Sequence, residues 1–100
     1  MLRHSVDIFE PLPRKEVIKS LLVIPGVGKS IAADLFNLGI RSVSDLKGSS
    51  PEQLYKRSNE LAGTRQDPCL LYVFRCAVYF AETPLPDKKK LLWWYWKEGR

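Results

Sequence analysis

The sequence predicts an all-α protein built from five or six short helices. Apolar residues recur along most of the chain at the spacing of one helix face, and no stretch of useful length shows the alternation of a half-buried strand. Prolines, glycines and helix-capping residues separate these periodic segments. With 100 residues, 45% of them hydrophobic, the chain can form one domain with a core of modest size.

Two helices are expected in the first part of this domain. Residues 1–12 show no clear periodicity, and we expect an N-terminal arm there, ahead of a single domain over residues 13–97. The first helix begins near Arg14, after a proline that suits a first turn, and ends before Pro25. The second begins near Lys29. Apolar residues at helical spacing define the inner faces of both helices: Val17, Ile18, Leu21, Leu22, Ile31, Ala32, Leu35, Phe36 and Leu38.

The second half of the chain contains three more expected helices. A short turn over residues 42–46 leads to a helix that begins at Ser50 with a cap, a proline and a capping-box glutamine. Asp67 and the proline after it start the next helix, over residues 69–82, which is apolar nearly all round and therefore expected to be the buried central helix. A Trp-rich closing helix is expected over residues 87–97.

The charge balance favours a polyanionic partner. The chain has sixteen lysines and arginines and eleven acidic residues, which gives a formal net charge of +5. Summed positive charge raises the rate of encounter with phosphate backbones. A charge of this size also serves solubility alone, so the charge by itself does not decide the function.

The cysteines and the apolar runs bear on the compartment. Cys69 and Cys76, if both lie on one helix, have Cα atoms about 10 Å apart. A disulfide needs Cα atoms within about 7 Å, so two thiols that cannot pair favour a reducing compartment. The N-terminus does not have the pattern of a signal peptide, and no apolar run is long enough to span a bilayer. We expect a cytoplasmic protein with no membrane partner.

The stretch PGVGKS, residues 25–30, contains the last letters of a nucleotide-binding P-loop. The full P-loop pattern is G-x-x-x-x-G-K-[ST], which would require a first glycine where this chain has Val23. A P-loop also follows a β-strand, whereas a segment of helical period precedes this turn. The pattern therefore argues against nucleotide binding.

A different pattern fits the same turn. The residues match h-x-x-h-x-G-h-G-x-x-x-A-x-x-h through Leu21, Ile24, Gly26, Val27, Gly28, Ala32 and Leu35. This stretch resembles the helix-hairpin-helix motif. Its glycines are expected to allow a turn that side chains would block, and Val27 between them to point into the core. The second helix would then begin with unpaired N–H groups beside Lys29 and Ser30, which is an anion site.

The resemblance implies a compact helix-hairpin-helix (SAM-like) domain that holds the sugar-phosphate backbone of DNA without reading bases. Carried over by position, the contacts would come from the amides of Gly26 and Gly28, with Lys29 and Ser30. The protein would act as an accessory or adaptor module. The alternative is a protein-interaction module on the same fold that binds no DNA. A second, degenerate hairpin is expected near Gly63, mainly in a structural role.

A wider resemblance covers about four-fifths of the chain. The segments IPGVGKSIAADLFNLGI, DLKGSSPEQLY, CLLYVFRCAVYFAE and WWYWKEG are similar to the pathogenicity-locus proteins, a family also labelled as mitomycin-resistance proteins. The same arrangement resembles the C-terminal domain of TfoX-type competence regulators. The resemblance implies a bacterial cytoplasmic protein with a helix-hairpin-helix domain and implies no particular activity.

No catalytic or metal-binding set is visible. The single histidine, His4, would have to serve any Ser-His-Asp or Cys-His site, and it lies in the expected arm. Cys69 and Cys76 match no metal-ligand spacing and are read as small buried hydrophobic residues. We expect no enzyme activity, no metal and no cofactor. Arg75, inside the apolar helix, is expected to reach water or pair with an acid that the sequence does not identify.

The three tryptophans allow two interpretations. Trp93, Trp94 and Trp96 could stack on unpaired bases, or they could close the core. We favour core packing, with one Trp edge left exposed as a surface for a protein partner. Lys88, Lys89 and Lys90 would flank that surface as a solvated run or an added phosphate contact.

Overall fold

A computed structural model of the chain describes residues 13–99, and these residues are helical with no strand. The elements are the helices α2 (Arg14–Leu21), α3 (Lys29–Asn37), α4 (Pro51–Ala62) and α5 (Cys69–Glu82), and the 3-10 segments η1 (Val43–Leu46), η2 (Lys88–Leu91) and η3 (Trp93–Gly99). The prediction of an all-α protein is confirmed. The arm expected over residues 1–12 lies outside the described residues.

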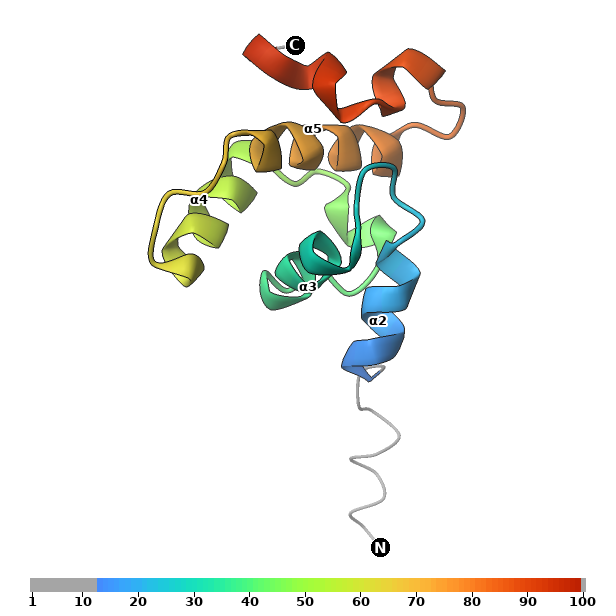
Figure 1. Ribbon diagram of the computed structural model, residues 1–100. Coiled ribbons are helices and arrows are strands. Elements are labelled where there is room, and N and C mark those ends of the chain that lie inside the picture. The colour runs from blue at the N-terminus through green and yellow to red at the C-terminus, as the bar shows by residue number, and fades with distance from the viewer. Residues whose placement is uncertain (1–12, 100) are drawn as a thin grey trace, which may run out of the picture.

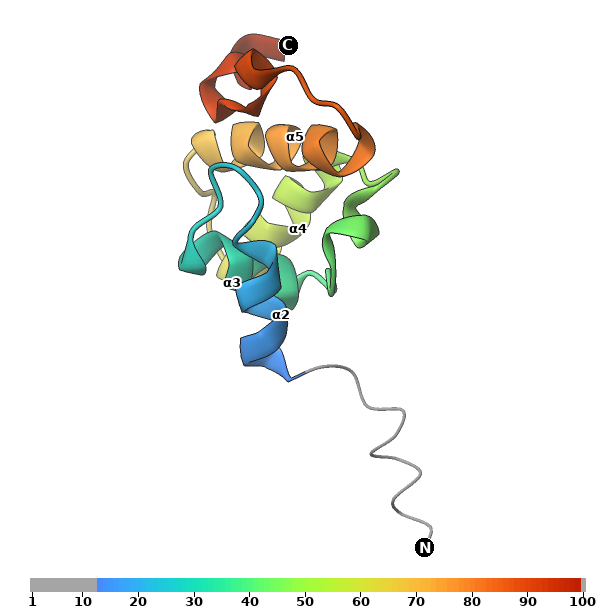
Figure 2. The ribbon, with the colours of Figure 1, turned by 90° about the vertical axis from the view of Figure 1, so that its right-hand side faces the viewer.

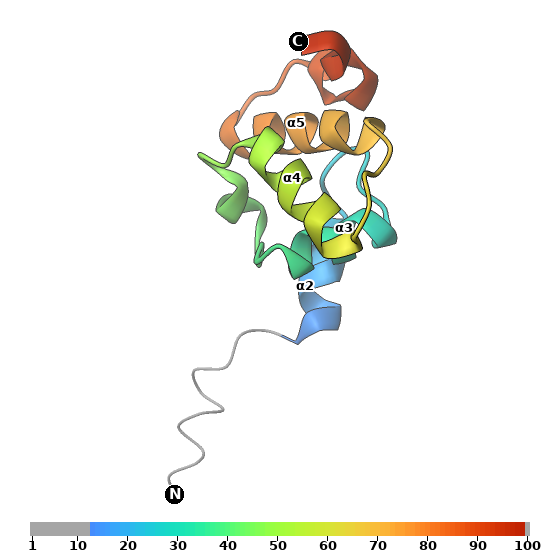
Figure 3. The same cartoon turned by 90° about the vertical axis from the view of Figure 1, so that its left-hand side faces the viewer.

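Helix α5 is the centre of the fold. Figure 1 shows the closing segment, η2 and η3, on one side of α5 and α2, α3 and α4 on the other, and the turned views of Figure 2 and Figure 3 agree. Phe74, Cys76 and Ala77 are completely buried. Because other elements cover α5 from both sides, its nearly continuous apolar surface is buried, as the sequence predicted.

The ends of α4 follow the sequence signals. The Ser50 side chain accepts a hydrogen bond from the N–H of Gln53 at 3.2 Å, and proline occupies the first turn. Gly63 ends α4 in the left-handed region, with φ +73°. A local cap at one end and a glycine at the other account for these boundaries.

The closing segment differs from the single helix expected over residues 87–97. Leu92 is extended, with φ −91° and ψ 121°, and separates two 3-10 segments. In a 3-10 helix residues three apart share one face. Trp93 and Trp96 are therefore presented together toward the rest of the molecule. The short turn at residues 43–46 is also 3-10, so the described residues contain four α-helices where five or six helices were expected.

None of the helices among residues 13–99 has both the length and the apolar character that crossing a bilayer requires.

Candidate functional site

The glycine turn joins α2 to α3 and is fixed from inside by two apolar side chains. Ile24 and Val27 are 1% and 7% exposed, and the Val27 N–H donates to the carbonyl of Ile24 at 3.1 Å. Ala32, one turn into α3, is completely buried. The expectation that Val27 points into the core is confirmed, and so the turn is held rigidly on the surface of the domain.

The two glycines of the turn have different reasons to be glycine. Gly26 has φ +81°, and a Cβ on it would lie 3.4 Å from Cδ1 of Trp93. Gly28 is extended, with φ −96° and ψ −172°, and a Cβ there would meet nothing within 4 Å. The expectation that side chains would block the turn is right for Gly26 and wrong for Gly28. Nothing inside the described structure requires a glycine at position 28, and its bare backbone faces open space.

The start of α3 leaves backbone donors unused. Gly28 is the N-cap residue, no side chain of the described residues caps the helix, and its first turn contains no acidic residue. The Ala32 N–H donates to the carbonyl of the N-cap residue, Gly28, at 2.9 Å. The N–H groups of Gly28, Lys29 and Ser30 have no acceptor within residues 13–99, and these three residues are exposed. Exposed donors at the positive end of a helix dipole favour an anion.

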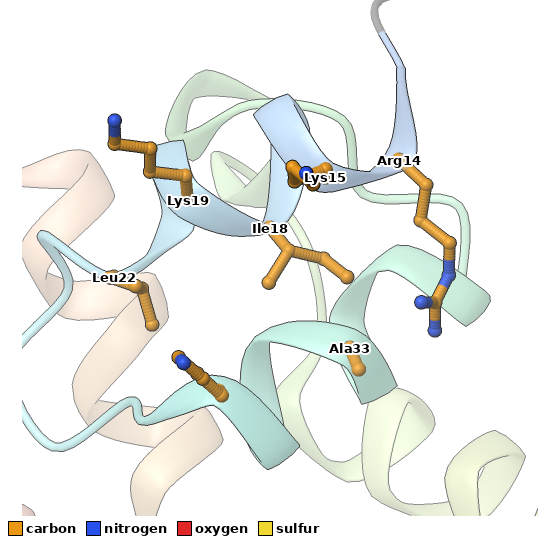
Figure 4. Close-up of a pocket in the computed structure, with 7 residues that line it drawn as sticks. Arg14, Lys15, Ile18, Lys19, Leu22 and Ala33 are labelled. Carbon is orange, nitrogen blue, oxygen red and sulfur yellow. The ribbon is translucent and has the colours of Figure 1, made fainter.

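An open groove of about 790 Å³ lies between α2 and α3 (Figure 4). Its rim carries four cations, Arg14, Lys15, Lys19 and Lys29, and its floor is apolar, made of Ile18, Leu22 and Ala33. Figure 4 shows Arg14 extending from α2 toward α3. The lining includes no carboxylate among the residues that the structure describes. The groove therefore carries positive charge along α2, from the side of the glycine turn to Arg14, whose guanidinium lies 5.4 Å from the ring of Phe36 near the end of α3.

Sequence reasoning missed three of these cations. The sequence alone assigned no role in binding to Arg14, Lys15 or Lys19. Lys15 and Lys19 are four residues apart, with Leu22 three further on, and these spacings put all three on one helix face. That spacing was the available signal. That this face of α2 lies across a groove from Lys29 required the packing of α2 against α3.

The connection from α4 to α5, where a second hairpin was expected, uses its polar groups internally. The Gln66 N–H donates to Oδ1 of Asn59 at 2.9 Å, and its side-chain amide donates to Oγ of Ser58 at 2.8 Å. Tyr55 donates its hydroxyl proton to the Gln66 carbonyl at 2.6 Å. The carboxylate of Asp67 accepts the N–H of Cys69 at 2.8 Å. This network braces the connection, and both the backbone N–H and the side-chain amide of Gln66 are used inside it.

The three tryptophans separate into two that are engaged and one that is exposed. Trp93 packs on Gly26 and against the core. Trp96 donates its indole N–H to the Lys90 carbonyl at 2.8 Å, and its ring lies 5.4 Å from that of Tyr79. Trp94 is 51% exposed. This agrees with the favoured interpretation of the sequence, in which the tryptophans pack on the core and one indole stays exposed, and the exposed one is Trp94.

Arg75 is tied down by two partners that the sequence did not identify. Its Nε lies 3.3 Å from a carboxylate oxygen of Glu52 on α4, and its Nη1 donates to the Trp96 carbonyl at 2.8 Å. The side chain of Arg75 is 16% exposed. One guanidinium therefore joins α4, α5 and the closing segment.

Cys76 is completely buried whereas Cys69 is only partly buried, so the expectation of a small buried residue is confirmed for Cys76 and wrong for Cys69. Burial raises the pKa of the Cys76 thiol to about 11, and the thiol lies 3.5 Å from the Lys90 carbonyl. The nearby Asp67 carboxylate raises the pKa of Cys69. Neither cysteine is in a disulfide. Within residues 13–99 no group of three histidine, cysteine or acidic side chains is placed to hold a metal, and His4 lies outside the described residues.

The sequence of the chain is similar to a known protein family and to a known protein. Residues 14–100 match the sequence profile of a family described as pathogenicity locus. The chain is 35% identical over 80 residues to the mitomycin resistance protein McrB of Streptomyces lavendulae, a stretch that covers 80% of this chain and 72% of that protein. No solved structure matches the chain.

Proposed function

The chain belongs to the pathogenicity locus family, and from this premise and the open glycine turn we propose that it is a helix-hairpin-helix protein that binds the DNA backbone without sequence preference. It acts in this proposal as an accessory or adaptor module. The contacts are the backbone N–H groups of Gly26 and Gly28, with the side chains of Lys29 and Ser30. The two free thiols favour the cytoplasm as its compartment.

The observation that carries the proposal is the unoccupied set of donors at the start of α3. The N–H groups of the exposed residues Gly28, Lys29 and Ser30 lie at the positive end of the helix dipole, and no side chain of residues 13–99 caps them. The extended backbone at Gly28 has open space in front of it, so a phosphate oxygen can approach the amides closely. A tetrahedral anion is the ligand that these groups suit.

Two features favour a polymer over a single anion. The cationic rim of the groove extends the positive surface along α2, so that successive phosphates of one strand meet further lysines. The proposed contacts of the turn, its amides with Lys29 and Ser30, are all directed at phosphate, and contacts to phosphate alone carry no sequence information. Non-specific binding to the DNA backbone follows from both.

The test is binding of labelled duplex DNA measured against salt. About two to four phosphate contacts give a log–log slope of about −2 to −4. Lys29→Gln is expected to weaken binding and reduce the slope by about 0.9, whereas Lys56→Gln, an equal charge change at an exposed position of α4, leaves the slope unchanged. Absence of binding at low salt, or equal effects of the two variants, contradicts the proposal.

The apolar floor of the groove favours a second candidate function. Ile18, Leu22 and Ala33 lie beneath the cationic rim, and a protein segment with apolar and acidic residues would complement both. In that case the chain is a protein-interaction module. Leu22→Gln distinguishes the two functions, because Leu22 is an exposed floor residue that contributes no charge. It weakens binding of such a partner and leaves duplex DNA binding unchanged.

A further inference from the structure

Trp94 is a large aromatic ring that the fold leaves half outside. Its exposed fraction is 51%, although burying an indole is among the larger apolar gains available to a small domain. The 3-10 geometry of η3 explains the orientation, since residues three apart share a face and Trp93 and Trp96 occupy the inner one. Nothing in the packing of the described residues uses the outer face of Trp94.

The exposed ring lies next to the glycine turn. Trp93 contacts Gly26, where a Cβ would lie 3.4 Å from its Cδ1. The Trp94 ring packs edge-on against Trp93, with the ring centroids 5.6 Å apart and an interplanar angle of 85°. One side chain therefore separates Trp94 from the turn that presents the backbone amides. The edge contact with Trp93 supports one side of the Trp94 ring and leaves the rest of the ring exposed.

A cation accompanies the ring on the same side of the closing segment. Lys97 is three residues after Trp94 in η3 and is exposed. Residues with this separation lie above one another in a 3-10 helix. The outer face of η3 therefore combines an aromatic surface with a positive charge, which is the combination that single-stranded nucleic acid requires.

We propose that Trp94 stacks on an unpaired base of the strand whose phosphate lies at the glycine turn, so that the protein prefers DNA with unpaired bases to blunt duplex. This inference rests on the proposed function. Bases inside a duplex are stacked on each other and offer no face to a protein ring, whereas an unpaired base beside the bound phosphate does. The substrate class is single-stranded DNA or a duplex with a single-stranded tail or gap.

The experiment compares three labelled probes of equal length: a blunt duplex, a duplex with a single-stranded tail, and an oligo-dT strand. Trp94→Ala is expected to weaken binding to the tailed and single-stranded probes by about tenfold and to leave the blunt duplex unchanged. Trp94→Phe keeps a ring and is expected to recover most of the loss. Leu85→Ala, at a position 92% exposed in the loop before η2, is the matched control for removing exposed apolar surface.

A second readout follows the ring directly. Stacking quenches indole fluorescence, so oligo-dT is expected to quench the wild-type protein more than Trp94→Phe. Circular dichroism establishes that each variant is folded. An equal loss on all three probes, or no loss on any, overturns the stacking proposal while binding of the wild-type protein to duplex DNA preserves the proposed function. Failure of the wild-type protein to bind any probe overturns both.

Discussion

The starts of α3 and α5 differ in what accepts the hydrogen bonds of their first backbone N–H groups. Both helices follow a connection from a preceding helix, and both begin with backbone donors that need an acceptor. At α5 the acceptor is internal, because the Asp67 carboxylate takes the N–H of Cys69 at 2.8 Å. At α3 no side chain of residues 13–99 serves as the acceptor, and the N-cap residue is Gly28. The domain thus supplies its own anion at one helix start and leaves the other open to an external one.

The Asp67 carboxylate also shows what a helix start does to a negative charge. Its pKa is lowered from the ordinary value, chiefly by the hydrogen bond from the Cys69 backbone. The fold therefore favours the ionised carboxylate at this position. The donors at the start of α3 are of the same kind and are unoccupied, so they favour an anionic ligand for the same physical reason.

The strongest way to break this comparison is to give the start of α3 an internal carboxylate, as Asp67 provides for α5. In Gly28→Asp the new carboxylate is expected to accept an N–H of the first turn and to occupy the place of the phosphate. DNA affinity falls at least tenfold, about 1.4 kcal/mol, while the unfolding free energy stays the same or rises slightly. Fluorescence anisotropy and urea unfolding measure the two quantities.

Gly28→Asn is the control for that variant, since asparagine caps as well without a charge. It is expected to lose less DNA affinity than Gly28→Asp and to be equally stable. Unchanged DNA affinity in Gly28→Asp would remove the start of α3 from the binding site.

The next largest expected effect is a difference in the free energy of unfolding between alanine variants of the two glycines, Gly26 and Gly28. Gly26→Ala is expected to destabilise the fold by about 1–2 kcal/mol, because alanine has to adopt φ +81°. Gly28→Ala is expected to change the unfolding free energy by less than about 0.5 kcal/mol, because the backbone is extended and the space is open. Urea unfolding of both variants tests the assignment. Equal destabilisation would mean that Gly28 is also needed by the fold itself.

A smaller effect is expected at the start of α5. Asp67→Ala removes the internal acceptor and is expected to lower the unfolding midpoint by less than Gly26→Ala does, without changing DNA affinity. The pKa of Asp67 is lower in the folded protein, so its contribution to stability is present above the unfolded pKa of about 3.9 and is lost as the pH falls through the folded value. Asp67→Asn is therefore expected to flatten the stability profile below about pH 4. A profile identical to that of the wild type would show that the cap contributes nothing.

The sequence predicted the helices and the turn well because their signals are local. Ser50 and Gly63 mark the ends of α4 through their own cap and backbone geometry, and α5 was recognised as central from its composition alone. The closing segment was predicted less well. Whether it forms an α-helix or two 3-10 segments depends on where Trp93 and Trp96 meet the core, which is a property of the assembled fold.

The candidate site shows the same division between local and assembled features. Gly26, Gly28, Lys29 and Ser30 were found because the motif is contiguous in the sequence. The different roles of Gly26 and Gly28 could not be found in this way, because they depend on the backbone angles and neighbours of each glycine in the folded structure. The cationic rim on α2 was missed for a related reason, because it becomes a site only across a groove from Lys29.

The smallest predicted effect tests how far the open site extends beyond the turn. Lys15 lies on the groove rim, one helix away from the start of α3. If a second phosphate of the bound strand reaches the rim, Lys15→Gln reduces the log–log salt slope by about 0.9 and lowers the affinity severalfold, with unfolding unchanged. An unchanged slope in Lys15→Gln beside a reduced slope in Lys29→Gln would confine the contact to the turn. In that case the start of α3 would bind a single phosphate. The groove, with its apolar floor, would then be available to a protein segment and would take no part in DNA binding.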